Sequence, residues 1–176
     1  ENVNYDSDFD ALKNEMGKLG GIDVELIEQK ARLILESKSK DLRVMAFLSY
    51  VCLRQEQWES FCDIYDGMAQ LSAQDFDKLY PDRPRAKQLG LKWLSEDRFN
   101  DLLNQKKPQA ADHEHINRLV AALETLKPIL EQKFPDGSPF PANLFKIAQT
   151  WQKATKPAPV QQQPAAPTAA PGAPTI

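Results

Sequence analysis

Apolar residues recur at helical spacing along nearly the whole chain as far as residue 155. Trp58, Phe61, Cys62, Tyr65 and Met68, for example, follow one another at intervals of three or four, which places them on one face of a helix. Alternation of apolar and polar residues over five or more positions, the pattern of a half-buried strand, does not occur between turn signals. The chain is therefore predicted to be all-α, a multi-helix bundle of about 7–9 helices.

Several residues mark where the first helices should begin. Ser7 and Asp23 are suited to cap the first two helices, and Asp41 precedes a third over about 41–54 that is apolar on most sides. Such a helix belongs at the centre of a bundle. Ser72 is expected to open a short helix that holds Phe76.

The segment after residue 80 is expected to turn its apolar side chains toward the core. Pro84 suits the first turn of a helix that presents Ala86, Leu89, Trp93 and Leu94. We expect these four side chains to be buried. Another short helical turn should follow, capped by Ser95.

The chain divides into three parts by composition. Residues 1–105 form the first helical unit, and residues 109–155 form a helical hairpin in which Pro128 predicts a kink or break. About 45 residues seldom bury enough apolar area to fold alone, so the hairpin should pack on the first unit. Residues 156–176, rich in Pro, Ala and Gln, are expected to form a disordered linker.

Charge and apolar content exclude several classes of protein. The net charge of −3 gives no general attraction to nucleic acid or to an anionic membrane. No apolar stretch approaches the roughly 20 residues that span a bilayer. Only two cysteines are present, too few for a disulfide framework, which favours a reducing compartment.

Residue patterns typical of catalysis or ligand binding are missing. His113 and His115 are two positions apart, a spacing that suits metal chelation on a helix poorly. Cys52 and Cys62 lack metal-site spacing and are expected to be buried as small hydrophobic residues. We therefore predict no catalytic, cofactor-binding or metal-binding residues, and no enzyme activity.

One basic cluster could serve as a docking face. It comprises Arg83, Arg85, Lys87, Lys92 and Arg98. Trp93 and Phe99 lie between these residues, which could suggest a nucleic-acid platform, but their helical spacing favours a place in the core. The favoured interpretation is a solvated basic face, with protein docking as the alternative and nucleic-acid binding as a remote one.

Arg43 should need a carboxylate partner, because it lies one turn inside a mostly apolar helix. Asp6, Asp8 and Asp10 are the candidates. With Asp41 as helix cap, Asp8 and Arg43 would form a structural brace between the N-terminal segment and the central helix.

Four short segments occur in a fixed order in the first 94 residues. They are Glu1-Asn2-Val3-Asn4-Tyr5-Asp6-Ser7-Asp8-Phe9 with Leu12, Ser39-Lys40-Asp41-Leu42-Arg43-Val44, Leu79-Tyr80-Pro81, and Arg85-Ala86 through Trp93-Leu94. Together they resemble the ImpA N-terminal domain of the TssA family, cytoplasmic components of the bacterial type VI secretion system. The resemblance covers about residues 1–105. Where the family often has a glycine between the third and fourth helices, this chain has Gln55-Glu56-Gln57, and Phe76 replaces a common tryptophan.

The resemblance implies an all-helical domain without catalytic activity or cofactor. Its expected partners are other secretion subunits: the baseplate, the membrane complex, and the tail tube or sheath, whose assembly the family helps to recruit or prime. Oligomerisation is expected from regions beyond residue 176. Two alternatives stay open: a generic helical adaptor, and an ImpA-domain protein that acts at the distal end of the sheath or at the membrane.

Overall fold

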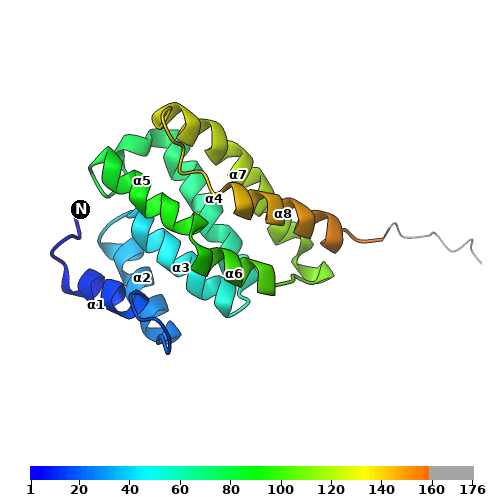
Figure 1. Cartoon of the computed structure of the whole chain (residues 1–176), viewed down its shortest axis with the longest axis horizontal. Helices are drawn as coiled ribbons and strands as arrows, with labels where there is room; N and C mark the ends of the chain where they lie inside the picture. Colours follow the sequence, from blue (N-terminus) through cyan, green and yellow to red (C-terminus); the bar gives the residue numbers. More distant parts are fainter. Residues whose placement is uncertain (159–176) are drawn as a thin grey trace, which may run out of the picture.

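The computed structural model describes residues 1–158 and shows a bundle of helices (Figure 1). Within these residues there is no strand, and a single isolated bridge joins Asp41 to Tyr80. The α-helices are α1 (Ser7–Met16), α2 (Val24–Ser37), α3 (Leu42–Arg54), α4 (Trp58–Asp75), α5 (Pro84–Lys92), α6 (Asp97–Gln105), α7 (His113–Lys133) and α8 (Ala142–Thr155). Three short 3-10 helices are η1 (Phe76–Lys78), η2 (Trp93–Ser95) and η3 (Ala110–Asp112). The predicted all-α class is confirmed; of the predicted linker 156–176, residues 159–176 lie outside the described part.

Side-chain caps fix the starts of the first three helices. Asp23 and Asp41 accept backbone N–H bonds at the starts of α2 and α3, as predicted. The cap of α1 is Asp6, not Ser7, and it accepts from the N–H groups of Asp8 and Phe9. Asp6 therefore caps its own helix, a local role that differs from the predicted pairing with Arg43.

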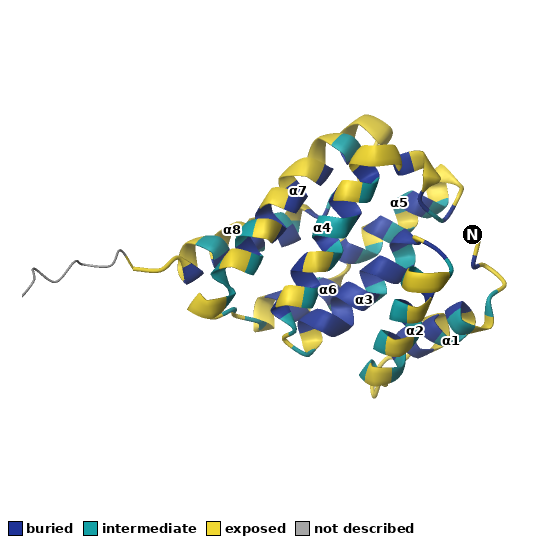
Figure 2. Ribbon diagram, turned by 180° about the vertical axis from the view of Figure 1, so that it is seen from behind, coloured by how far each residue is buried: buried dark blue, intermediate teal, exposed yellow. Residues whose placement is uncertain are grey.

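α3 is the central helix, and nearly all of its sides are buried (Figure 2). It packs against α2, α4 and α5. The phenolic oxygen of Tyr65 on α4 donates to the hydroxyl of Ser49 on α3 over 2.9 Å, so the polar atoms of this buried pair are satisfied. The predicted central position follows from the lack of a polar face on this helix.

α3 ends in a turn that places a charged residue in a left-handed conformation. The N–H of Glu56 bonds to the carbonyl of Leu53, and the N–H of Gln57 bonds to that of Cys52. This is the Schellman arrangement, and Glu56, with φ of 56°, occupies the position where glycine is preferred.

α4 is longer than predicted. Ser72 does not open a new helix but lies buried inside α4, which continues to Asp75. The reason is tertiary: α7 lies along α4 and covers it, so the last turns of α4 gain packing that a free segment would lack. α7 likewise runs through Pro128 without a break.

α5 turns a different side to the core than predicted. Of the predicted residues only Leu94 is buried, together with Lys87 and Leu91, whereas Leu89 is 52% exposed and Ala86 and Trp93 are half-buried. The amino group of Lys87 donates to the carbonyls of Asp82 (3.0 Å) and Asp77 (3.4 Å). Because these carbonyls satisfy the ammonium group, the lysine side of α5 can face inward. The predicted cap Ser95 instead ends η2, and α6 begins at Asp97.

The hairpin of α7 and α8 shares one hydrophobic core with the first six helices. α7 packs on α4, and α8 packs on α7 and α6. Trp151 on α8 meets Trp58 on α4 edge to face, with ring centroids 5.1 Å apart. One turn further along α8, His113 Nδ1 lies 2.9 Å from the hydroxyl of the buried Thr155.

Candidate protein-docking surface

Arg43 is held at the start of α3 by three neighbours. Its Nε and Nη2 contact the two carboxylate oxygens of Asp41 at 3.1 and 2.7 Å, and Nη2 also donates to the side chain of Asn4 at 3.0 Å. The guanidinium lies 4.4 Å from the centre of the Phe9 ring. The prediction that Arg43 pairs with an N-terminal carboxylate is wrong. Its carboxylate partner is Asp41, two residues away, and the N-terminal segment contributes the amide of Asn4 and the ring of Phe9.

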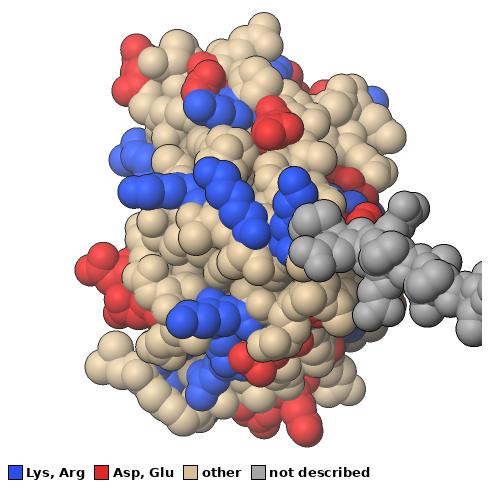
Figure 3. All heavy atoms as spheres, turned by 90° about the vertical axis from the view of Figure 1, so that its right-hand side faces the viewer, with Lys and Arg blue, Asp and Glu red and all other residues tan. Residues whose placement is uncertain are grey.

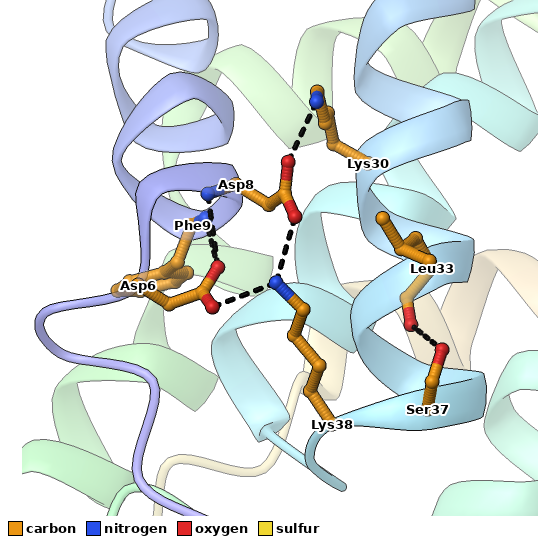
Figure 4. Close-up of polar contacts among 7 residues, drawn as sticks. All are labelled: Asp6, Asp8, Phe9, Lys30, Leu33, Ser37 and Lys38. Carbon is orange, nitrogen blue, oxygen red and sulfur yellow. Dashed lines mark hydrogen bonds and ion pairs between the residues drawn. The ribbon is translucent and has the colours of Figure 1, made fainter.

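Asp6 and Asp8 instead join α1 to α2 (Figure 4). The amino group of Lys38 contacts carboxylate oxygens of both aspartates at 2.7 Å, and Lys30 contacts Asp8 at 2.6 Å. Hydrogen bonds from Lys38 and Lys30 lower the pKa of the Asp8 carboxyl, and the Lys38 bond lowers that of Asp6. Asp8 therefore braces the N-terminal helix, but through Lys30 of α2 and Lys38 at its C-cap, and not through Arg43.

Gly90 allows α5 to lie directly on the aliphatic stem of Arg43. A Cβ at position 90 would come within 2.8 Å of Arg43 Cγ. This close approach leaves a shallow hollow of about 330 Å³ between α5 and α3, lined by Arg43, Phe47, Ala86, Leu89, Gly90 and Trp93. We call it the α5 groove. Its floor is largely apolar, and the Trp93 and Phe47 rings pack edge to face with centroids 5.3 Å apart.

A second hollow of about 550 Å³ adjoins the α5 groove at Arg43 and Ala86, which line both. The N-terminal segment supplies part of its wall, including Tyr5, whose side chain is 98% exposed. The two hollows therefore form one continuous surface over the N-terminal segment, α3 and α5.

The five residues of the predicted basic docking face do not lie together. Arg83 and Arg85 at the start of α5 and Lys92 at its end are exposed beside the α5 groove. Lys87 is buried, which contradicts its place on a solvated face, and burial lowers the pKa of its amino group. Arg98 is half-buried; it donates to the carbonyl of Met16 at 2.5 Å and lies 4.9 Å from the centre of the Tyr50 ring.

Basic side chains also gather elsewhere on the molecule. At the end from which the chain leaves α8, Lys and Arg cross the middle of the surface while Asp and Glu lie nearer its edges (Figure 3). Positive charge alone therefore does not single out one face. The α5 groove differs from this end in combining bordering cations with uncovered apolar side chains.

The side chains that could carry chemistry lie apart from this surface. Cys52 and Cys62 are buried and unpaired, and burial raises the pKa of each thiol to about 12, so neither forms a reactive thiolate at neutral pH. Residues 1–158 contain no group of three or more His, Cys, Asp or Glu placed to hold a metal ion. None of the described helices has the length and apolar character needed to cross a membrane.

Comparison with solved structures first identifies the class of fold to which this protein belongs. A solved N-terminal domain of the TssA component of the type VI secretion system from Burkholderia cenocepacia, which includes its conserved ImpA_N region, superposes with a TM-score of 0.68. The match covers 88% of this chain and 85% of that one at 14% sequence identity, and so it shows a shared helical fold. No curated protein matches the chain.

The family itself is shown by the sequence. The family described as "ImpA, N-terminal, type VI secretion system" matches residues 1–102. The chain therefore belongs to the ImpA N-terminal family of the type VI secretion system, as the four ordered segments predicted. The residues that carried the resemblance include Tyr5, Arg43, Ala86 and Trp93, which line the two adjoining hollows.

Proposed function

We propose that this chain is a non-catalytic protein-interaction module of a TssA-like secretion component. It acts in the bacterial cytoplasm and helps to recruit or prime the baseplate and the tail tube or sheath. Family membership supports the secretion role. The observation that carries the docking role is the uncovered apolar groove beside α5, where Leu89 is 52% exposed.

The surface proposed for docking consists of the α5 groove with Arg83, Arg85 and Lys92 beside it. Exposed charges at the border of an interface orient and speed association, while apolar side chains at its centre supply most of the affinity. Asp8, Asp41 and Arg43 hold the N-terminal segment against α2 and α3 and thereby keep this surface in shape.

Binding of purified secretion subunits to the immobilised 176-residue chain tests this proposal. Baseplate, membrane-complex, sheath and tube subunits are each passed over the chain, and at least one should bind reversibly. If none binds this chain while a longer protein that contains it does bind, the module is a spacer. Binding of single-stranded nucleic acid at micromolar affinity in about 150 mM salt would contradict the proposal.

A further inference from the structure

The border of the α5 groove is positively charged. Arg85 and Lys92 lie four residues before and three residues after Leu89, so their side chains flank it on the exposed side of the helix. Arg83, Arg85 and Lys92 have no carboxylate within ion-pair distance among residues 1–158; Arg85 bonds only to the neutral side chain of Gln88. Asp82 is the one exposed acid that lines either hollow.

The centre of the same surface is apolar. Leu89 is one of four large hydrophobic side chains that residues 1–158 leave exposed, and Tyr5, another of the four, lines the adjoining hollow. A strip of apolar side chains bordered by unpaired cations is complementary to a segment that is apolar along one side and acidic beside it.

We infer that the α5 groove binds an amphipathic helix of a partner protein, with large apolar side chains at intervals of three and four and with Asp or Glu beside them. This inference rests on the proposed function and specifies the partner's chemistry. A helix satisfies its own backbone hydrogen bonds, whereas an extended segment that binds by adding a strand needs a sheet edge, and the described residues contain no strand. The groove itself runs between two helices, α3 and α5, which suits a third helix laid beside them.

Charge argues against one other occupant, and the geometry of the aromatic rings argues against a second. A second copy of this chain paired symmetrically through the same surface would bring Arg83, Arg85 and Lys92 toward their own equivalents. Single-stranded nucleic acid needs aromatic faces on which bases stack. Here Trp93 packs edge to face on Phe47 and Tyr50, and aliphatic Leu89 and Ala86 occupy the rest of the floor.

The test uses the tryptophan indole N–H signals of the 15N-labelled chain in solution. Trp58 and Trp151 are buried, while Trp93 lies in the groove, so one of the three signals reports on occupancy. The probe is a synthetic helical peptide with leucines at intervals of three and four and glutamates beside them. The matched control peptide has the same leucines, with lysine in place of every glutamate.

The acidic peptide should move the Trp93 signal and leave those of Trp58 and Trp151 in place. It should bind at least about ten-fold more tightly than the lysine peptide, because only the former complements the border charges. Leu89→Glu should abolish binding, whereas Leu33→Glu, a substitution of an exposed leucine on α2, should not. Arg83→Glu with Arg85→Glu should weaken binding, whereas the same reversal at Lys107 and Lys153, which are exposed elsewhere, should not.

Several results would overturn the inference. These are equal or tighter binding of the lysine peptide, no binding of either peptide, or unchanged binding by the Leu89→Glu chain. A dimer of the chain that Leu89→Glu dissociates would assign the groove to a second copy. A Trp93 shift caused by single-stranded oligonucleotide but not by the acidic peptide would assign it to nucleic acid.

The outcome is separable from that of the proposed function. If a secretion subunit binds and Leu89→Glu has no effect, the groove inference fails while the docking role stands. If the acidic peptide occupies the groove but no secretion subunit binds or competes, the proposed function fails while the groove inference stands.

Discussion

Arg43 is the residue on which the arrangement of the N-terminal segment depends most directly. Its partner Asp41 is fully buried, while the Arg43 side chain is 21% exposed. Arg43→Ala would leave the Asp41 carboxylate buried without its cation, so we expect a loss of about 3 kcal/mol in the free energy of unfolding. Urea denaturation followed by circular dichroism measures this value.

The matched control for Arg43 is Arg54→Ala, at the exposed end of the same helix. This change should alter stability by less than about 0.5 kcal/mol. A loss under about 1 kcal/mol for Arg43→Ala would show that the pair behaves as an ordinary surface ion pair. Arg43→Lys should recover only part of the loss, because an ammonium group cannot contact Asp41 through two parallel donors.

Glu56 is the second residue whose own backbone conformation should affect the stability of the fold. Its left-handed backbone costs a non-glycine residue about 1–2 kcal/mol, and its ion pair with Lys106 is long, at 3.6 Å, with the Glu56 side chain exposed. Glu56→Gly should therefore raise the free energy of unfolding by about 0.5–1 kcal/mol after the added entropy of an unfolded glycine is subtracted. Thermal unfolding should show a higher midpoint for this variant.

Gln55→Gly provides the comparison for Glu56→Gly, because residue 55 has φ of −86° and gains nothing from glycine. It should lower the midpoint. An equal midpoint for Glu56→Gly and the wild type would mean that the turn carries no backbone cost.

At the scale of elements, two helical glycines should respond oppositely to alanine. Gly67 in α4 has open space where a Cβ would lie, so Gly67→Ala should stabilise the protein by up to about 1 kcal/mol through helix propensity. Gly90 in α5 gains the same propensity, but its new Cβ would meet Arg43 Cγ. Overpacking of this kind costs about 1–3 kcal/mol, so Gly90→Ala should be less stable than wild type.

Chemical denaturation of both glycine variants under one set of conditions measures the difference. If both alanines stabilised the protein, α5 would not lie on Arg43 as closely as the structure shows. The result bears on function as well, because the distance between α5 and α3 sets the width of the α5 groove.

At the scale of the whole molecule, the lysine contacts of Asp6 and Asp8 make stability depend on acid pH. Their folded pKa values are lowered from the ordinary 3.8, mainly by hydrogen bonds from Lys38 and Lys30. A carboxyl with a lowered folded pKa contributes stability that is fully present above its unfolded pKa and is lost as pH falls through the folded value. We therefore expect this contribution at neutral pH and its loss well below pH 3.8.

Lys38→Met tests the pH dependence. It should destabilise the protein at about pH 7, and the difference from wild type should shrink as the pH is lowered toward about 2. Lys153→Met, which removes an exposed lysine outside any described ion pair, should show no such trend. A Lys38→Met difference that stayed constant with pH would mean that packing of the lysine stem, and not its charge, stabilises the α1–α2 contact.

The sequence by itself determined most of the helices, two of their caps and the family. Helical spacing, Asp23 and Asp41 as caps and Pro84 in a first turn are local features, and they appear in the structure as predicted. The buried, unreactive cysteines also followed from local pattern, because each lies within an apolar helical stripe.

Only the tertiary structure decided which side of a helix faces the core. For α5 and the η2 turn after it, the predicted inward residues were Ala86, Leu89, Trp93 and Leu94, but a second stripe of Lys87, Leu91 and Leu94 is also possible. The second is buried because distant carbonyls accept the Lys87 ammonium group and because Gly90 lets α5 rest on Arg43. Ser72 was misassigned for a similar reason, because packing of α7 on α4 accompanies the longer α4. The partner of Arg43 was misassigned because Asp41, two residues away, already contacts the guanidinium, while Lys30 and Lys38 bind the carboxylates of Asp6 and Asp8. Local pattern determines which segments become helices, whereas contacts between segments far apart in the chain determine which faces remain free to bind a partner.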